Sequence, residues 1–286
     1  MKVIAVYHNK GGVGKTTIVV NLAAALSKKG KRILVIDLDS QANATFATGL
    51  IKFEDEKDDD LKNANIQHVL EMEDKYFIHE VVRKSQFNTP EIDVVPSHIM
   101  LMEKENELSR NRQTELIFSH KLKSVENQYD FVLIDTSPAL NLYTRVALTG
   151  ADYLIIPSDL KPFANQVLAN VKNFVKDNNI FRKLLNKRPI QVLGVLPSKI
   201  PLNSEFRQYT LPKRMENVRQ NYGLPVMNTC ISERSDLGAC MESIIVTSDG
   251  AIPHPRSIFD YRGGNSRSVA EFEALADELL QKTGEL

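Results

Sequence analysis

The chain has 286 residues, and its 36 lysines and arginines balance 36 aspartates and glutamates, so the formal net charge is zero. This balance argues against a molecule whose whole surface binds nucleic acid. Only Cys230 and Cys240 are present, which excludes a disulfide scaffold and favours a reducing compartment such as the cytoplasm. Alternating apolar segments and amphipathic helices predict one α/β domain, residues 1–286, with a doubly wound, mostly parallel twisted sheet flanked by helices.

The first apolar segment, residues 3–7, is too short for a signal peptide and predicts the first strand. Directly after it come Lys10, Gly11, Gly12, Val13, Gly14, Lys15, Thr16 and Thr17. Glycine-rich turns before a helix leave backbone N–H groups free to point at phosphate oxygens. We expect Lys15 to neutralise the β- and γ-phosphates and the Thr16 hydroxyl to bind Mg²⁺. These eight residues therefore predict a phosphate-binding loop (P-loop) for a nucleoside triphosphate.

The loop departs from the usual pattern at its start. Asn9 stands where a glycine is usual, and a second lysine, Lys10, follows it. The turn aims this lysine away from the phosphates of its own chain, but it is able to reach a nucleotide bound to a facing subunit. Taken alone, such a lysine is more often a solvated side chain.

Two further apolar segments end in acids. Residues 33–36 lead into Asp37 and Asp39, and residues 131–134 lead into Asp135. The carboxyl ends of central parallel strands face the ligand crevice in such sheets. Because Mg²⁺ prefers oxygen ligands, we expect Asp135 to bind it directly or through water. The alternative for any one of these acids is a cap or turn residue.

Three motifs together resemble the ParA/MinD family of ATPases, in its ParA-type partition branch. They are Lys-Gly-Gly-x-Gly-Lys-Thr at residues 10–16, Asp-x-Asp-x-Gln-x-Asn at 37–43 and Asp-Thr-Ser-Pro at 135–138. The resemblance extends over essentially the whole chain, but its specific part lies before residue 140. In the last motif the family usually has two prolines where this chain has serine and proline.

The resemblance implies a P-loop NTPase fold, ATP and Mg²⁺ as cofactors, and a homodimer that encloses ATP between its subunits. Lys10 would act in trans on the partner's nucleotide, beside Lys15. Asp39 would orient or activate the attacking water, and Asp37 would support the metal shell. The implied metal ligands are Thr16, Asp39 and Asp135.

The family also implies a base-reading position in the segment 194–199. An asparagine usually contacts adenine there, and Ser198 stands at that position. Adenine is thus implied by the resemblance and by no residue of this chain. The apolar residues 151–157 match the strand that follows the third motif in the family.

Residues 182–219 carry nine basic side chains against two acidic ones, a local excess of +7. The cations are Arg182, Lys183, Lys187, Arg188, Lys199, Arg207, Lys213, Arg214 and Arg219. Clustered cations bind backbone phosphates without sequence preference, although a charge run is more often a solvated face. Because the family binds DNA non-specifically through C-terminal basic residues, we expect DNA contacts at Arg207, Lys213, Arg214 and Arg219.

Other segments complete the predicted layout. Residues 92–97 predict a strand and 100–112 a charged helix, while the acidic run 54–60 predicts a solvated surface loop. A terminal helix over residues 268–280 is expected to pack Phe272, Leu275, Ala276 and Leu279 onto the body. A helix that seeks membranes should be basic, and this one carries several acids. We therefore expect no membrane partner.

The function implied by the resemblance is ATP-driven positioning by a cytoplasmic, nucleoid-associated protein. An ATP-bound dimer would bind DNA non-specifically, and a ParB-like or cargo-adaptor protein would stimulate its weak hydrolysis, positioning a plasmid, a chromosome or a protein organelle such as a carboxysome. Three alternatives stay open: a MinD-like membrane-associated ATPase, a redox enzyme similar to nitrogenase iron proteins, and a ligase similar to biotin-pathway synthetases. The redox enzymes have cluster cysteines between the motifs, where this chain has none, and the ligases lack a lysine at the Lys10 position.

Overall fold

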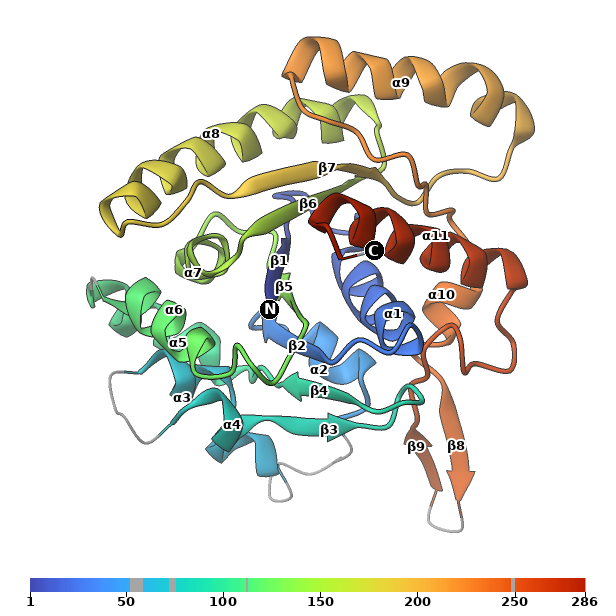
Figure 1. The fold of residues 1–286 in the computed structure, drawn as a ribbon. Helices are drawn as coiled ribbons and strands as arrows, with labels where there is room; N and C mark the ends of the chain where they lie inside the picture. Colours follow the sequence, from blue (N-terminus) through green and yellow to red (C-terminus); the bar gives the residue numbers. More distant parts are fainter. Residues whose placement is uncertain (52–58, 72–75, 112, 248–249, 286) are drawn as a thin grey trace.

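The computed structural model describes residues 1–51, 59–71, 76–111, 113–247 and 250–285, and Figure 1 shows their arrangement. A seven-stranded sheet in the order β3-β4-β2-β5-β1-β6-β7 forms the centre. Every neighbouring pair is parallel except β3 and β4. Its strands are β1 Lys2–Val6, β2 Ile33–Leu38, β3 Arg83–Ser85, β4 Ile92–Val95, β5 Phe131–Thr136, β6 Tyr153–Ser158 and β7 Gln191–Pro197.

The register of the three central strands aligns their carboxyl ends. Asp37 of β2 pairs with Asp135 of β5, and Asp135 pairs on its other side with Val6 of β1. The P-loop begins a few residues after Val6. The sheet therefore brings the loop and both acidic motifs to one edge, although Asp37 and Asp135 are about a hundred residues apart in the chain.

Helices cover both faces of the sheet, because the buried strands carry apolar residues on both sides. Ile4 and Val6 of β1 face a cluster with α1 and α11, whereas Val3, Ala5 and Tyr7 face a cluster with α3 and α5–α8 (Figure 1). The helices are α1 Lys15–Lys28, α2 Asn43–Ala47, α3 Ile66–Leu70, α4 Ile78–Val81, α5 Met100–Arg110, α6 Thr114–Lys123, α7 Leu142–Gly150, α8 Pro162–Leu184, α9 Leu211–Asn217, α10 Asp236–Ala239 and α11 Ser266–Thr283.

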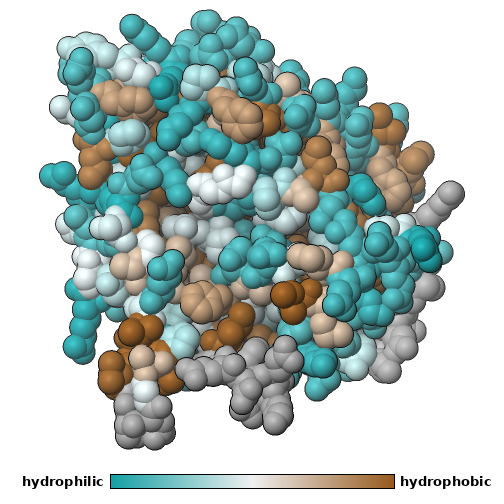
Figure 2. Space-filling model, turned by 180° about the vertical axis from the view of Figure 1, so that it is seen from behind, coloured by the Kyte–Doolittle hydropathy of each residue, from teal (hydrophilic) through white to brown (hydrophobic). Residues whose placement is uncertain are grey.

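Two elements lie outside these layers. The helix α9 is extended at both ends by π-helical turns, Phe206–Thr210 and Val218–Tyr222. The strands β8 (Ile244–Thr247) and β9 (Gly250–Pro253) pair as an antiparallel ribbon that projects from the body. Its apolar side chains gather at the lower left of Figure 2, and Val246 is 82% exposed.

The predicted fold class is confirmed: a mostly parallel sheet lies between two helical layers. The predicted terminal helix forms as α11, and Phe272, Leu275, Ala276 and Leu279 are fully buried in it. The predicted helix at 100–112 forms as α5 and ends at Arg110. Within the residues that the structure describes, no helix combines the length and the apolar character needed to cross a membrane.

The prediction of a solvated acidic loop is wrong at Asp59, although Asp60, the last residue of the run, is exposed. Residues 54–58 of that run lie outside the described residues. Asp59 is packed into the body, with its side chain 8% exposed, and its carboxylate lies 2.6 Å from Nε2 of His98. It also caps a short 3₁₀ helix, Asp60–Asn63, by accepting from the N–H of Leu61. Asp59 is buried because it pairs with His98, and a count of charges along the sequence does not reveal this contact.

Candidate nucleotide-binding site

The loop between β1 and α1 has the backbone of an anion-binding turn. Gly12 and Gly14 have φ angles of 73° and 88°, in the left-handed region that glycine adopts at low cost. Helix α1 begins at Lys15 with no side-chain cap and no acidic residue in its first turn. Its first N–H groups and its positive end therefore remain available to a negatively charged ligand.

Thr16 and Asp135 lie in direct contact behind the loop. Thr16 Oγ1 donates a hydrogen bond to Asp135 Oδ2 over 2.7 Å. Burial and the neighbouring carboxylate of Asp37 raise the pKa of Asp135 to about 8. Burial lowers the pKa of Lys15, and the charges of Asp135 and Asp39 oppose that shift. One lysine thus faces several acids in a site nearly closed to water.

Asp37 holds the chain that follows β2. Its Oδ2 accepts hydrogen bonds from the N–H and the hydroxyl of Thr45, at 2.8 and 2.7 Å, and its Oδ1 accepts from the N–H of Asp39 at 3.0 Å. Burial raises the pKa of Asp37 to about 6, although the bonds from Thr45 act against the shift. Asp39 is also buried, and its Oδ1 accepts from the N–H of Gln41. Asp37 therefore shapes the turn that positions Asp39.

These residues fit a magnesium ion bound together with phosphates. A buried acidic cluster whose pKa values are raised by burial gains from an added cation. Mg²⁺ in nucleotide sites takes one or two carboxylates and a hydroxyl, with phosphates and water completing the shell. Among the described residues, no three His, Cys, Asp or Glu side chains are grouped to hold a metal by themselves. Thr16, Asp135 and Asp39 stay the predicted ligands.

The structure corrects the expected orientation of Lys10. Rather than extending away from its own subunit, its Nζ lies 2.7 Å from Oδ2 of Asp159, which follows the end of β6. Its N–H donates to Nδ1 of His8 over 2.9 Å. Burial and the charges of Lys15 and Lys10 lower the pKa of His8 to about 4, so this ring is neutral at physiological pH. Sequence reasoning missed His8 and Asp159, although Asp159 follows a strand that ends at the ligand edge.

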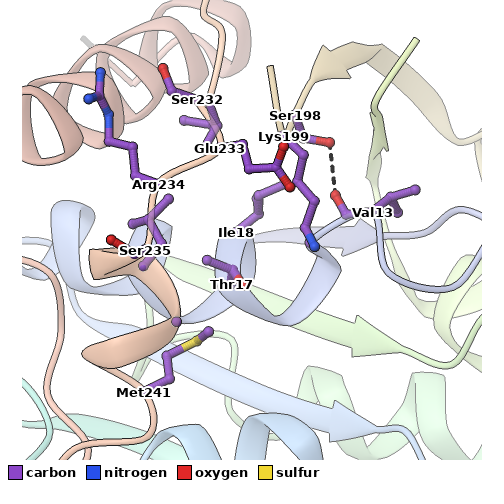
Figure 3. A pocket seen from close by; sticks show the side chains of 14 residues that line it. Val13, Thr17, Ile18, Ser198, Lys199, Ser232, Glu233, Arg234, Ser235 and Met241 are labelled. Atoms are coloured by element: carbon purple, nitrogen blue, oxygen red, sulfur yellow. Dashed lines mark hydrogen bonds between the residues drawn. The ribbon is translucent and has the colours of Figure 1, made fainter. Parts of the chain in front are cut away.

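A pocket of about 400 Å³ opens beside the loop, at the end of β7 where the sequence predicts that the base binds (Figure 3). Its apolar lining residues are Val13 and Ile18 from the loop and α1, and Ile231, Leu237 and Met241 from the segment 231–241. The side chains of Lys199 and Glu233 point toward its interior. The segment 231–241 was missed by sequence reasoning because no motif marks it.

Ser198 lies at this pocket, but its hydroxyl has an internal partner. Ser198 Oγ donates to the carbonyl oxygen of Val13 over 2.8 Å, shown as a dashed line in Figure 3. This bond ties the end of β7 to the P-loop. Ser198 thus lines the expected base site while its donor is directed at the loop.

The basic run 182–219 divides into two kinds of cation. The guanidinium of Arg182 is buried and donates to the carbonyl oxygens of Leu148, Thr149 and Ala151. Lys187 donates to Thr149 in the same way. These two cations stabilise the fold, so the count of nine overstates the surface charge.

The four expected DNA contacts lie on the helical segment 206–222. Arg207 is anchored to Pro201 O and Ser232 Oγ, Arg219 pairs with Glu216 at 3.3 Å, and the guanidinium of Arg214 lies 5.0 Å from the ring centroid of Phe206. Lys213 is exposed. Their contact with DNA stays a prediction.

The two cysteines lie after the motifs in the chain. Cys240 is buried, and burial raises the pKa of its thiol to about 12. Burial also raises the pKa of Cys230. Both thiols therefore favour the protonated form, which binds metals poorly.

Fold and site together define a P-loop nucleotide-binding protein. A family model described as an AAA domain matches residues 1–192. A ParA family protein of Chlamydia pneumoniae is 31% identical over 241 residues, covering 81% of this chain and 88% of that protein. The chain belongs to the ParA/MinD family of ATPases.

Two solved structures share the fold at low identity. A plasmid partition protein from Borrelia burgdorferi B31, bound to AMPPNP, has a TM-score of 0.71 at 23% identity and covers 98% of this chain and 99% of its own. A cobyrinic acid a,c-diamide synthase from Mycobacterium smegmatis, with a bound ATP analogue and magnesium, has a TM-score of 0.74 at 23% identity, covering 98% and 94%. At this identity the likeness concerns the fold alone.

Proposed function

We propose that this protein, as one ATPase domain over residues 1–286, binds ATP and Mg²⁺ and forms a homodimer around ATP. In that state it binds DNA non-specifically in the cytoplasm, at the nucleoid. A ParB-like or cargo-adaptor protein stimulates slow hydrolysis and releases the dimer, which positions or segregates a plasmid, a chromosome or a protein organelle.

The observation that carries the proposal is a second lysine, Lys10, at the start of a glycine-rich loop that leads into α1. Thr16 and Asp135 are already in contact, and Lys15 lies among the acids. Lys10 is paired with Asp159, which follows the end of β6. Family membership and the partition protein of the same fold support this assignment.

Within this proposal the residues divide the work between binding and chemistry. The N–H groups of Gly11, Gly12 and Gly14 and the start of α1 bind phosphate oxygens. Lys15, Lys10 of the facing subunit and the bound Mg²⁺ offset the charge that develops on the transferred phosphoryl group. Asp39, fixed by its contacts with Asp37 and Gln41, orients the attacking water.

Mg²⁺ would be held by Thr16 and Asp135, with Asp39 nearby, and would supply charge neutralisation. The burial of these acids also links the binding of the metal to the binding of the nucleotide. Because Asp135 is buried beside Asp37, the site is electrostatically unfavourable until cations and phosphates enter together. Nucleotide binding and metal binding are therefore coupled.

The alternatives lead to different measurements. A redox enzyme would need cluster cysteines, but the thiols of Cys230 and Cys240 are protonated and lie after the motifs. A ligase would show substrate-dependent turnover without dimerisation on ATP. A MinD-like protein would sediment with liposomes in ATP.

The first test measures mass and duplex-DNA binding without nucleotide, with ADP, and with ATP and Mg²⁺, at low and raised salt. We expect a dimer and salt-sensitive DNA binding only with ATP and Mg²⁺, and neither without nucleotide nor with ADP. The double variant Lys213→Ala/Arg214→Ala should bind DNA more weakly and lower the salt slope by about two. Arg110→Ala/Lys123→Ala, on α5 and α6, removes the same charge elsewhere and is the control. A dimer that ignores DNA in every state would contradict the nucleoid role.

A further inference from the structure

We infer that Asp159 is a positioning residue that holds Lys10 within its own subunit, so that this lysine must leave Asp159 before it can contact a nucleotide across the dimer. We call this ion pair the Lys10–Asp159 latch. The inference rests on the proposed function, since it concerns how the ATP-bound dimer forms.

The contact is short and shielded. Lys10 Nζ and Asp159 Oδ2 lie 2.7 Å apart, with side chains 21% and 11% exposed. The ring of Phe163, at the start of α8, lies 5.9 Å from the same ammonium group. An ion pair with this little water around it is screened less than an open surface pair.

Both partners are fixed by further bonds. The other carboxylate oxygen of Asp159, Oδ1, accepts from the N–H of Lys161 over 3.1 Å. Although burial acts against the shift, the bonds from Lys10 and Lys161 lower the pKa of Asp159, so it carries its charge. The N–H of Lys10 is bound to His8 Nδ1. The latch therefore joins two segments that are each held in place.

The turn that presents Asp159 is itself built for one geometry. Leu160 is buried with φ of 52°, a left-handed conformation that leucine rarely adopts. Its N–H donates to Ser158 Oγ over 3.1 Å. Moving Asp159 outward would require Leu160 to leave the core and lose this bond, so we expect the ion pair to break when Lys10 reaches another subunit.

This arrangement makes Asp159 a competitor of the partner's phosphates. In the monomer, the charge of Lys10 is paired with Asp159 of the same chain. In the dimer, Lys10 keeps a charged partner only if a phosphate of the facing subunit's nucleotide replaces this carboxylate. ADP, which lacks the γ-phosphate, offers less in exchange. The latch thereby raises the threshold for dimerisation and makes it depend on the triphosphate.

The test measures dimerisation against protein concentration in Mg²⁺ and a non-hydrolysable ATP analogue. In Asp159→Asn the Oδ1 acceptor for Lys161 remains and the charge is lost. Loss of a partly shielded ion pair changes an equilibrium about five-fold, so two latches should change the dimerisation constant about 25-fold in favour of the dimer. Asp159→Ser, which also offers an acceptor for the turn, should favour the dimer in the same way. Asp159→Glu, which keeps the negative charge, should favour the dimer less than Asp159→Asn does.

Asp260→Asn is the matched control. One oxygen of Asp260 lies 2.6 Å from Nζ of Lys28 and the other accepts from the N–H of Thr89. This pair has the same chemistry at the far end of α1, roughly 20 Å from the loop. Its loss should leave dimerisation unchanged.

A Lys10→Ala background separates the latch from a structural effect, because Asp159→Asn should change nothing further there. An Asp159→Asn effect that persists without Lys10 would overturn the latch. The latch would also be overturned if the wild type dimerises in the analogue and Asp159→Asn has an equal or weaker dimerisation constant. A wild type that stays monomeric in the analogue would instead overturn the proposed function, and the latch with it.

Discussion

The phosphate end and the base end of the candidate site are built in different ways. At the phosphate end, Lys15, Asp37 and Asp135 are buried, and the register of β1, β2 and β5 aligns Asp37 with Asp135. At the base end, Lys199 and Glu233 are exposed and belong to loops after β7 and before α10. Charges in a low-dielectric site interact strongly, whereas exposed ones are screened. Substitutions should therefore have large effects at the first end and small effects at the second.

The largest effect is expected from Lys15→Ala. It removes a buried cation from a group of acids that must accept phosphates, so ATP affinity should fall on the order of a hundred-fold, about 3 kcal/mol. Calorimetry with Mg-ATP measures it. Lys199→Ala, at the base end, is the control and should stay within about three-fold. Equal losses in the two variants would remove the contrast between the ends.

Asp39→Ala should come next. If Asp39 orients the attacking water, as proposed, its loss should lower kcat about a hundred-fold or more, while ATP affinity changes little and the dimer persists. Single-turnover hydrolysis together with ATP titration separates the two quantities. Gln41→Ala, on the same turn, serves as the control. Normal turnover in Asp39→Ala would remove Asp39 from the chemistry.

Asp135→Asn sharpens the electrostatic side of the comparison. Its folded pKa of about 8 exceeds the unfolded value of 3.8, so the folded, nucleotide-free protein binds the extra proton between these values. Stability therefore falls as pH rises through this window, and Asp37 adds to the slope with its pKa of about 6. The asparagine should flatten the decline and stabilise the nucleotide-free protein at pH 8, by the order of a few kcal/mol.

Urea unfolding at pH 5, 6.5 and 8 without nucleotide or Mg²⁺ measures this slope. Asp130→Asn is the control, and it should destabilise the protein where Asp135→Asn stabilises it. The hydrogen bond from Arg32 lowers the pKa of Asp130, so the charged carboxylate stabilises the fold at pH values above its unfolded pKa. A steeper decline in Asp135→Asn would show that the buried cluster is not strained by its charge.

The smallest effect is expected from Ser198→Ala. It removes the hydrogen bond to the Val13 carbonyl, which should cost about 1 kcal/mol of stability. Because the hydroxyl is directed at the loop, ATP affinity should change by less than about three-fold, and selectivity for ATP over GTP should not change. Thermal unfolding and competition binding measure both. A large loss of selectivity would make Ser198 a base-reading residue.

Much of the fold and of the phosphate end followed from local patterns. Short apolar segments ending in acids predicted β2 and β5, and the glycine-rich run predicted the loop before α1, because strand burial and glycine backbone freedom are local properties. The base pocket did not follow, since Ile231 and Met241 belong to no motif. The burial of Asp59 and Arg182 was equally invisible, because their partners, His98 and the carbonyls of residues 148–151, are distant in the chain.

Local patterns were enough to identify the class of the site, because a glycine-rich loop with two lysines and two acidic strand ends meet at the carboxyl edge of a parallel sheet. The pairing of side chains within the site became visible only in the folded chain. Thr16 contacts Asp135, while Lys10 turns back to Asp159, 149 residues away. Strand order and the turn after β6 place Asp159 beside the loop, and no spacing along the chain encodes that contact.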